Sequence, residues 1–130
     1  MKKICTLASI ILFLFCTNLK LSAQMHHGDW KEMEDFHEIM AIAFHSAEGD
    51  LFNPLKENSE LLVSKAQAWK DSAIPAEYNK KMTAKTLSQL VKQCKKVDKM
   101  VKKGASNEDL MAAITKAHDI FHSAMEKGKM

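Results

Sequence analysis

The sequence predicts an all-α protein, an antiparallel up-down-up-down four-helix bundle. Four segments repeat apolar residues at the three- and four-residue spacing of one helix face, and none shows the alternation of a β-strand. Short stretches that contain Gly, Pro or Asn separate these segments, and loops of this length make successive helices antiparallel. We expect the bundle to occupy residues 29–130, with its helices at about 29–48, 53–70, 75–103 and 106–127.

The first two expected helices have recognisable boundaries. Asp29, followed three residues later by Glu32, resembles a capping box, and Gly49 is expected to end the first helix. Asn53 followed by Pro54 is typical of a cap with proline at the first helical position. The expected inner stripes of these helices are Met33, His37, Met40, Phe44 and Ala47 in the first, and Leu55, Leu62, Ala66 and Trp69 in the second.

The last two expected helices are bounded in the same way. Pro75 is expected to open the third helix and Gly104 to close it, and Ser106 is expected to cap the fourth. The inner stripes are Leu87, Leu90, Cys94, Val97 and Val101 in the third, and Leu110, Ile114, Ala117, Phe121 and Ala124 in the fourth. Cys94 is therefore predicted to be a buried small hydrophobic residue.

Residues 1–23 have the pattern of a secretory signal peptide. Lys2 and Lys3 precede an apolar run that ends at Cys16, and Ala23 is a small residue at the cleavage position. The apolar run is shorter than the roughly 20 residues needed to span a membrane. We therefore expect a periplasmic or secreted protein with no membrane span after cleavage, preceded by a flexible leader at residues 24–28.

The charges exclude some functions. All 19 basic residues are lysines, and without residues 1–23 the chain has 16 lysines and 16 acids, which gives no reason to expect a nucleic-acid partner. The charges are segregated, because residues 29–50 hold seven acids and one lysine, while residues 80–103 hold nine lysines and one acid. No nucleophile elbow, phosphate-binding glycine loop or His-Glu-x-x-His motif is present, so we do not expect an enzyme.

Histidines on the first and fourth expected helices are the candidate ligands. At 100° per residue, His37 and His118 each lie about 50° from the centre of their apolar stripes, His122 about 90° away, and His45 faces water. At 1.5 Å per residue, His37 and His118 lie about 10–13 Å from the same end of the bundle. The sequence thus predicts two inward histidines at one level, able to bracket a flat ring or to share a metal ion.

The segment around His118 resembles the C-terminal helix of the cytochrome c-prime family and of its non-covalent relative, the soluble periplasmic cytochrome b. Ile114 and Ala117 stand where the covalent family has its two cysteines, His118 stands at the ligand position, and an Asp and an aromatic residue follow. The missing cysteines exclude thioether attachment. These cytochromes use arginine near the haem, and this chain has none, so lysine would serve the propionates only as a point charge.

The resemblance implies a protein that binds non-covalent haem b and acts in electron transfer or haem handling. It implies His118 as one axial ligand and His37, or else Met33 or Met40, as the other, with Phe121 also at the haem. A redox protein would then be the expected partner.

Two alternatives are left open. The first is a module that binds copper, nickel or zinc through His37, His118 and His122 with help from methionine, and meets a metal-handling partner. It includes a leader site, because cleavage after Ala23 would expose Gln24-Met25-His26-His27, whose amine, backbone amides and His26 suit square-planar Cu(II) or Ni(II). The second alternative is a cofactor-free helical adaptor whose acidic and lysine-rich faces meet a partner protein.

Overall fold

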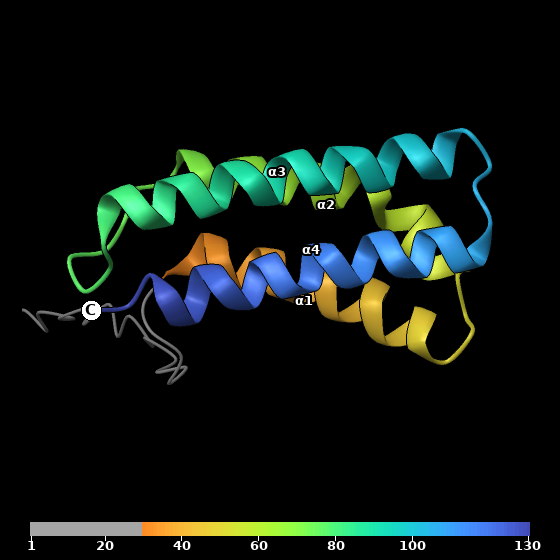
Figure 1. The fold of residues 1–130 in the computed structure, drawn as a ribbon, viewed down its shortest axis with the longest axis horizontal. Helices are drawn as coiled ribbons and strands as arrows, with labels where there is room; N and C mark the ends of the chain where they lie inside the picture. Colours follow the sequence, from red (N-terminus) through yellow and green to blue (C-terminus); the bar gives the residue numbers. More distant parts are fainter. Residues whose placement is uncertain (1–29) are drawn as a thin grey trace, which may run out of the picture.

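A computed structural model describes residues 30–130, which form a four-helix bundle (Figure 1). Its helices are α1 (Lys31–Glu48), α2 (Asn53–Asp71), α3 (Lys80–Lys102) and α4 (Asn107–Lys127). Each helix packs on the next one along the chain, and α1 also packs on α4, which closes the ring. The pair α1 and α4 lies on one side of the bundle, and α2 and α3 lie on the other. The predicted fold class is confirmed.

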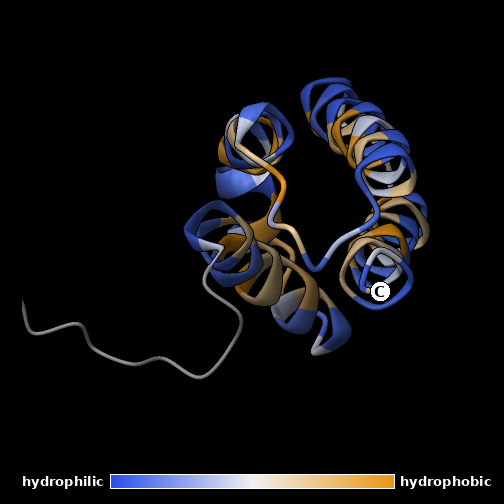
Figure 2. Ribbon diagram, turned by 90° about the vertical axis from the view of Figure 1, so that its left-hand side faces the viewer, coloured by the Kyte–Doolittle hydropathy of each residue, from blue (hydrophilic) through white to orange (hydrophobic). Residues whose placement is uncertain are grey.

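One core lies between the four helices. Figure 2 looks along the bundle and shows apolar parts of the helices turned toward one another and polar parts turned outward. Aromatic rings fill the end where α1 begins: the ring of Trp30 lies 5.6 Å from that of Trp69 and 5.2 Å from that of Tyr78. Phe36 and Phe121 continue this cluster toward the middle, and both are fully buried. Each such ring removes a large apolar area from water, which stabilises the fold by about 1.5–3 kcal/mol per side chain.

The inner face of α1 is rotated from the predicted one. Its buried residues are Met33, Phe36, Met40, Ala43, Phe44 and Ala47. Phe36 is fully buried, whereas His37 is exposed. Successive residues on an α-helix point about 100° apart, so burying the larger and fully apolar Phe36 turns His37 toward solvent. The prediction that His37 faces inward is therefore wrong.

α3 begins at Lys80, five residues after the predicted start at Pro75. The Asn79 side chain caps the helix, because its Oδ1 accepts a hydrogen bond from the Met82 N–H at 3.0 Å. The preceding residues form a turn, in which the Tyr78 N–H donates to the Pro75 carbonyl at 3.0 Å, and Tyr78 forms an isolated antiparallel bridge with Lys129. Backbone hydrogen bonds join Asn79 N to Gly128 O at 2.7 Å and Met130 N to Glu77 O at 2.8 Å. These bonds tie the segment before α3 to the segment after α4 and compete with a longer helix.

The other boundaries differ in detail. Asn53 is the first helical residue of α2, and Phe52 precedes it without a side-chain cap, so the predicted Asn53 cap is wrong. Gly104 adopts a left-handed φ of 70° after α3, as expected of a closing glycine. The Ser106 hydroxyl accepts a hydrogen bond from the Asp109 N–H at 3.1 Å, as predicted for the α4 cap.

Cys94 is buried in the core, as predicted, and burial raises the pKa of its thiol to about 12. Among residues 30–130, no helix combines the length and apolarity that a membrane span needs. The predicted signal peptide at 1–23, the leader at 24–28 and the Asp29 cap lie outside the described residues.

Candidate metal site on the first and last helices

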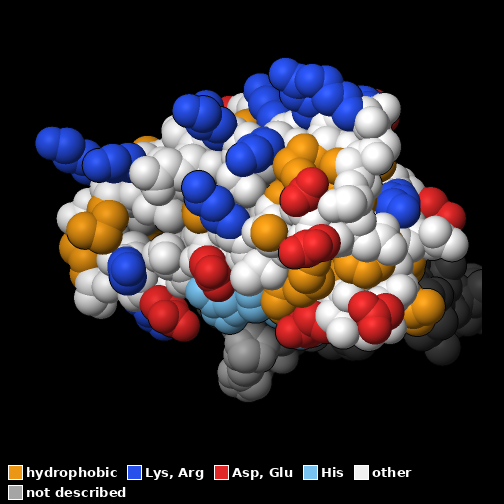
Figure 3. Space-filling view, turned by 45° about the vertical axis from the view of Figure 1, so that its right-hand side comes forward, with side chains coloured by type: hydrophobic (Ala, Val, Ile, Leu, Met, Phe, Trp, Pro, Cys, Tyr) orange, Lys and Arg blue, Asp and Glu red, His pale blue; other side chains and the backbone are white. Residues whose placement is uncertain are grey.

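Four histidines lie on α1 and α4 within residues 30–130: His37 and His45 on α1, and His118 and His122 on α4. Figure 3 shows histidine side chains gathered in one patch with acidic side chains close to it, while lysines crowd the opposite edge of the same view. The patch lies where α1 and α4 meet, because rings from the two helices stack on each other there. This juxtaposition makes the histidines the candidate site.

His118 and His122 form the centre of the site. They lie one helical turn apart and point in the same direction. Their Nε2 atoms are 3.2 Å apart, and their rings meet edge to face with centres 4.5 Å apart. Metal–nitrogen bonds of 2.0–2.1 Å place two imidazole nitrogens about 2.9–3.4 Å apart at right or tetrahedral angles. The two nitrogens therefore have the separation of ligands that share one ion; in the absence of metal, a proton can bridge them as a hydrogen bond.

The His118 ring packs against the ring of Phe44 on α1. The two rings are stacked with centres 3.9 Å apart and an interplanar angle of 9°. Phe44 itself is buried in the core, and His118 is partly buried against it. Packing on a fixed aromatic ring restricts rotation of the imidazole, so this half of the site is preorganised.

The surroundings of His118 favour its neutral form. Burial lowers the pKa of His118, the nearby His122 lowers it further, and Asp119 acts in the opposite direction. Lowering this pKa keeps the ring neutral at neutral pH. A neutral imidazole has a lone pair for a metal ion, whereas a protonated one does not.

Carboxylates lie beside the Nδ1 atoms of two of the rings. Glu48 Oε2 lies 2.8 Å from His45 Nδ1, and Glu126 Oε1 lies 3.8 Å from His122 Nδ1. At His45 the contact is a hydrogen bond and favours the tautomer with its proton on Nδ1, which leaves a lone pair on Nε2. The longer Glu126 contact at His122 adds negative charge only.

His45 is the residue that sequence reasoning left out of the site. It is exposed, as predicted, but its ring centre lies 6.2 Å from that of His118. Rings that share a tetrahedral ion have centres about 5 Å apart, given metal–nitrogen bonds of 2.0–2.1 Å. No group of three or more His, Cys, Asp or Glu side chains within residues 30–130 is arranged to hold a metal ion. The described residues thus bring two imidazole nitrogens together, with a third imidazole nearby.

The predicted haem residues are arranged differently from the expectation. The rings of His37 and Phe121 are stacked with centres 4.9 Å apart, and His118 lies 6.4 Å from the same Phe121 ring. Phe121 and Met40 are fully buried, and Met33 is buried as well. A haem held between His37 and His118 would have to displace Phe121, so the described residues do not fit a haem in this arrangement. His26 and His27 lie outside the described residues.

A search of protein-family models, curated proteins and solved structures finds no match to this chain. The cytochrome resemblance therefore stays a prediction, and the functional argument rests on the geometry of α1 and α4.

Proposed function

We propose that this protein is an exported metal-binding module that holds a divalent transition-metal ion through His118 and His122. The observation that supports it is the 3.2 Å separation of the two Nε2 atoms. The stacked Phe44 ring and the lowered pKa of His118 support the same conclusion, because both prepare one imidazole for a cation.

Cu(II) is the ion we expect to bind most tightly. Imidazole suits copper, nickel and zinc, and a site of given ligands binds Cu(II) more strongly than Ni(II) or Zn(II). Acidic side chains near the rings add to the attraction for a cation; these are Glu48, Asp119 and Glu126.

His45 completes the site in this proposal. Its side chain is exposed, so a change of rotamer would mainly have to replace its 2.8 Å contact with Glu48. A shift of about 1 Å would bring its ring to the distance at which imidazoles share an ion. Three imidazoles would leave a further coordination position open to water or to a ligand from a metal-handling partner protein.

Haem b has less support. It needs an axial pair facing each other across a flat ring, and the fully buried Phe121 occupies that space. Haem binding is therefore kept as one outcome of the test.

The test uses protein that carries His26→Ala and His27→Ala, which removes competition from the leader. Cu(II) is titrated into this protein and followed by calorimetry and by the nitrogen hyperfine structure of the copper EPR signal. We expect one tight equivalent with at least two imidazole nitrogens. His118→Gln and His122→Gln should each weaken binding by about tenfold or more, since loss even of a residue that only supports a ligand costs 10–100-fold.

His37→Gln is the matched control, because it removes an exposed α1 histidine outside the proposed ligand set. Its Cu(II) affinity should equal that of the parent protein. Equal weakening by all three variants, or no tight equivalent at all, contradicts the proposal. Haem titration provides the second arm: a Soret band that His118→Gln abolishes would favour the cytochrome hypothesis instead. His45→Gln should remove one nitrogen from the EPR pattern.

A further inference from the structure

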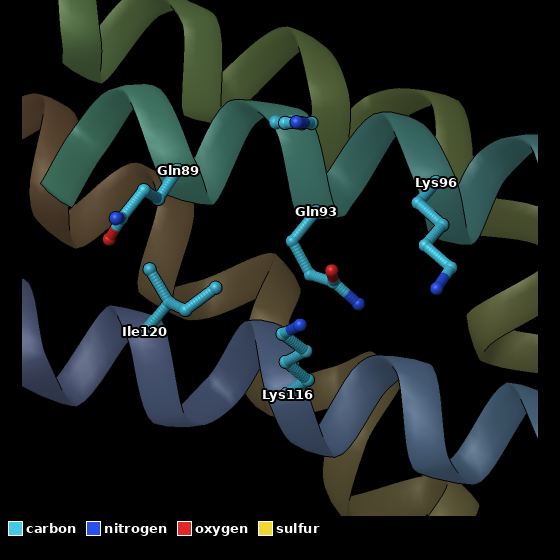
Figure 4. Close-up of a pocket in the computed structure, with 6 residues that line it drawn as sticks. Gln89, Gln93, Lys96, Lys116 and Ile120 are labelled. Carbon is cyan, nitrogen blue, oxygen red and sulfur yellow. The ribbon is translucent and has the colours of Figure 1, made fainter. Parts of the chain in front are cut away.

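A second concave surface lies on the other side of α4, between α3 and α4. It encloses about 460 Å³ and is lined by Gln89, Lys92, Gln93, Lys96, Lys116 and Ile120. Figure 4 shows side chains from both helices reaching into the space between them, with the amines of Lys96 and Lys116 among them. We call this surface the lysine groove.

The three lysines of the groove have no negative partner among residues 30–130. Lys92, Lys96 and Lys116 make no ion pair with any residue of the described part of the chain, and no acid lines the groove. By contrast, Lys102, which lies on α3 like Lys92 and Lys96, forms an ion pair with Asp98 at 2.7 Å. Like charges gathered on a concave surface repel one another and concentrate a positive potential, which an anion would relieve.

The floor of the groove is fixed by a buried hydrogen bond. Gln93 is buried, and its Nε2 donates to the Ala113 carbonyl at 2.9 Å, which ties α3 to α4 beneath the lysines. Ile120 adds an apolar wall. A smaller hollow of about 310 Å³ continues the groove past Lys96 and Lys116, and Asp109 lies in its lining. Asp109 therefore marks one end of the lysine-lined part of the groove along the helices.

We infer that the lysine groove binds a small organic anion that carries two or more negative charges. Lysine ammonium groups bind phosphates and carboxylates as point charges, and three of them match a polyanion better than a single charge. The volume lies in the range of pockets for small molecules, about 300–1,000 Å³. The apolar Ile120 and the amides of Gln89 and Gln93 line the space that the organic part of the anion would occupy. This inference does not depend on the metal site.

The test titrates citrate and, separately, inorganic pyrophosphate into ¹⁵N-labelled protein. The side-chain amide of Gln93 serves as the reporter, because it lies in the floor of the groove. We expect saturable shifts for at least one anion; the stronger of the two distinguishes a carboxylate from a phosphate ligand. The double variant Lys96→Gln/Lys116→Gln should weaken binding by at least about tenfold, since two of the three ammonium groups are lost.

The matched control is Lys95→Gln/Lys99→Gln, which removes the same charge from exposed positions of α3 that do not line the groove. It should change affinity by less than about twofold, because exposed ammonium groups that do not line the groove would act on the anion only through solvent, where salt screens them. Equal weakening by both double variants would show a general positive field rather than a site, and so would overturn the inference. Absence of saturable shifts with both anions overturns it as well. Circular dichroism confirms that both variants keep the parent fold.

Discussion

The two sides of α4 differ in how they hold charge. His118 packs on Phe44 of α1, with His122 one turn away, whereas Lys116 and Ile120 line the groove toward α3. Lys116 precedes His118 by two residues, and Ile120 precedes His122 by two residues. Two residues correspond to about 200° around the helix, so the two pairs lie on nearly opposite sides of it. On the α1 side the His118 ring is stacked on Phe44, and its Nε2 lies 3.2 Å from that of His122. On the α3 side, long lysines that form no ion pair within residues 30–130 line an open hollow.

This difference corresponds to two kinds of recognition. A metal ion needs ligand atoms placed within tenths of an ångström, so its site requires a stiff support such as the stacked Phe44 ring. An anion that is held by ammonium groups needs mainly charge, and flexible lysines on a fixed floor supply it. One helix can therefore present a preorganised cation site and an adaptable anion site without conflict.

The largest effect is expected from Phe44→Ala, which changes only the histidine side of α4. Removing this buried ring should lower the free energy of unfolding by about 3–5 kcal/mol. It should also lower Cu(II) affinity, because His118 loses the surface on which it stacks, while citrate binding stays unchanged. Urea unfolding and copper titration measure the two effects. Phe52→Ala is the control, since Phe52 is buried to a similar degree but does not line either site. Equal Cu(II) affinity in the two variants would contradict the supporting role of Phe44.

An intermediate effect is expected from Gln93→Ala, which changes the floor of the lysine groove. This change removes the buried hydrogen bond between α3 and α4 and should lower the free energy of unfolding by about 1–3 kcal/mol. Anion binding should weaken with it, while Cu(II) binding should not change. Gln89→Ala, at an exposed position of the same groove, is the control for stability. A loss of Cu(II) affinity in Gln93→Ala would show that the two sides of α4 are coupled.

The smallest effect concerns pH. The pKa of His118 is lower in the folded protein than its ordinary value of 6.5, so below that value the unfolded chain binds more protons. Stability should therefore fall as pH drops from 6.5 toward the folded pKa, and the parent protein should show a steeper loss than His118→Gln. Urea unfolding at a series of pH values measures this slope. Lys116→Gln, on the other side of α4, should keep the parent slope; a parent slope no steeper than that of His118→Gln would refute the assignment.

The four-helix bundle could be predicted from the sequence, whereas the face of α1 that is buried could not. Four apolar stripes and the residues between them sufficed for the fold class, because a helix must bury its apolar face. On α1, however, Phe36 and His37 are neighbours, and either can continue a stripe through Met33 and Met40. Contacts of Phe36 with Trp69 and Phe121 decide between them, and those residues belong to other helices.

The candidate site was predicted in part for the same reason. The spacing of His118 and His122 is local, so their common direction followed from one helix. The level of His118 relative to α1 is not local. Counting from the helix ends matched it with His37, but the structure places it beside Phe44, seven residues further along α1. The lysine groove also needs two helices: the lysine-rich character of α3 is visible in the sequence, but the contribution of Lys116 from α4 is not.

The bridge between Tyr78 and Lys129 has a consequence for the dynamics of the bundle. Segments that flank helix ends usually fray first and exchange their amide hydrogens rapidly. Here the amide of Asn79 is bonded to Gly128, and that of Met130 to Glu77, so the start of α3 and the end of α4 protect each other. These two amides, about 50 residues apart in sequence, should exchange at matching rates, because a single opening event exposes both.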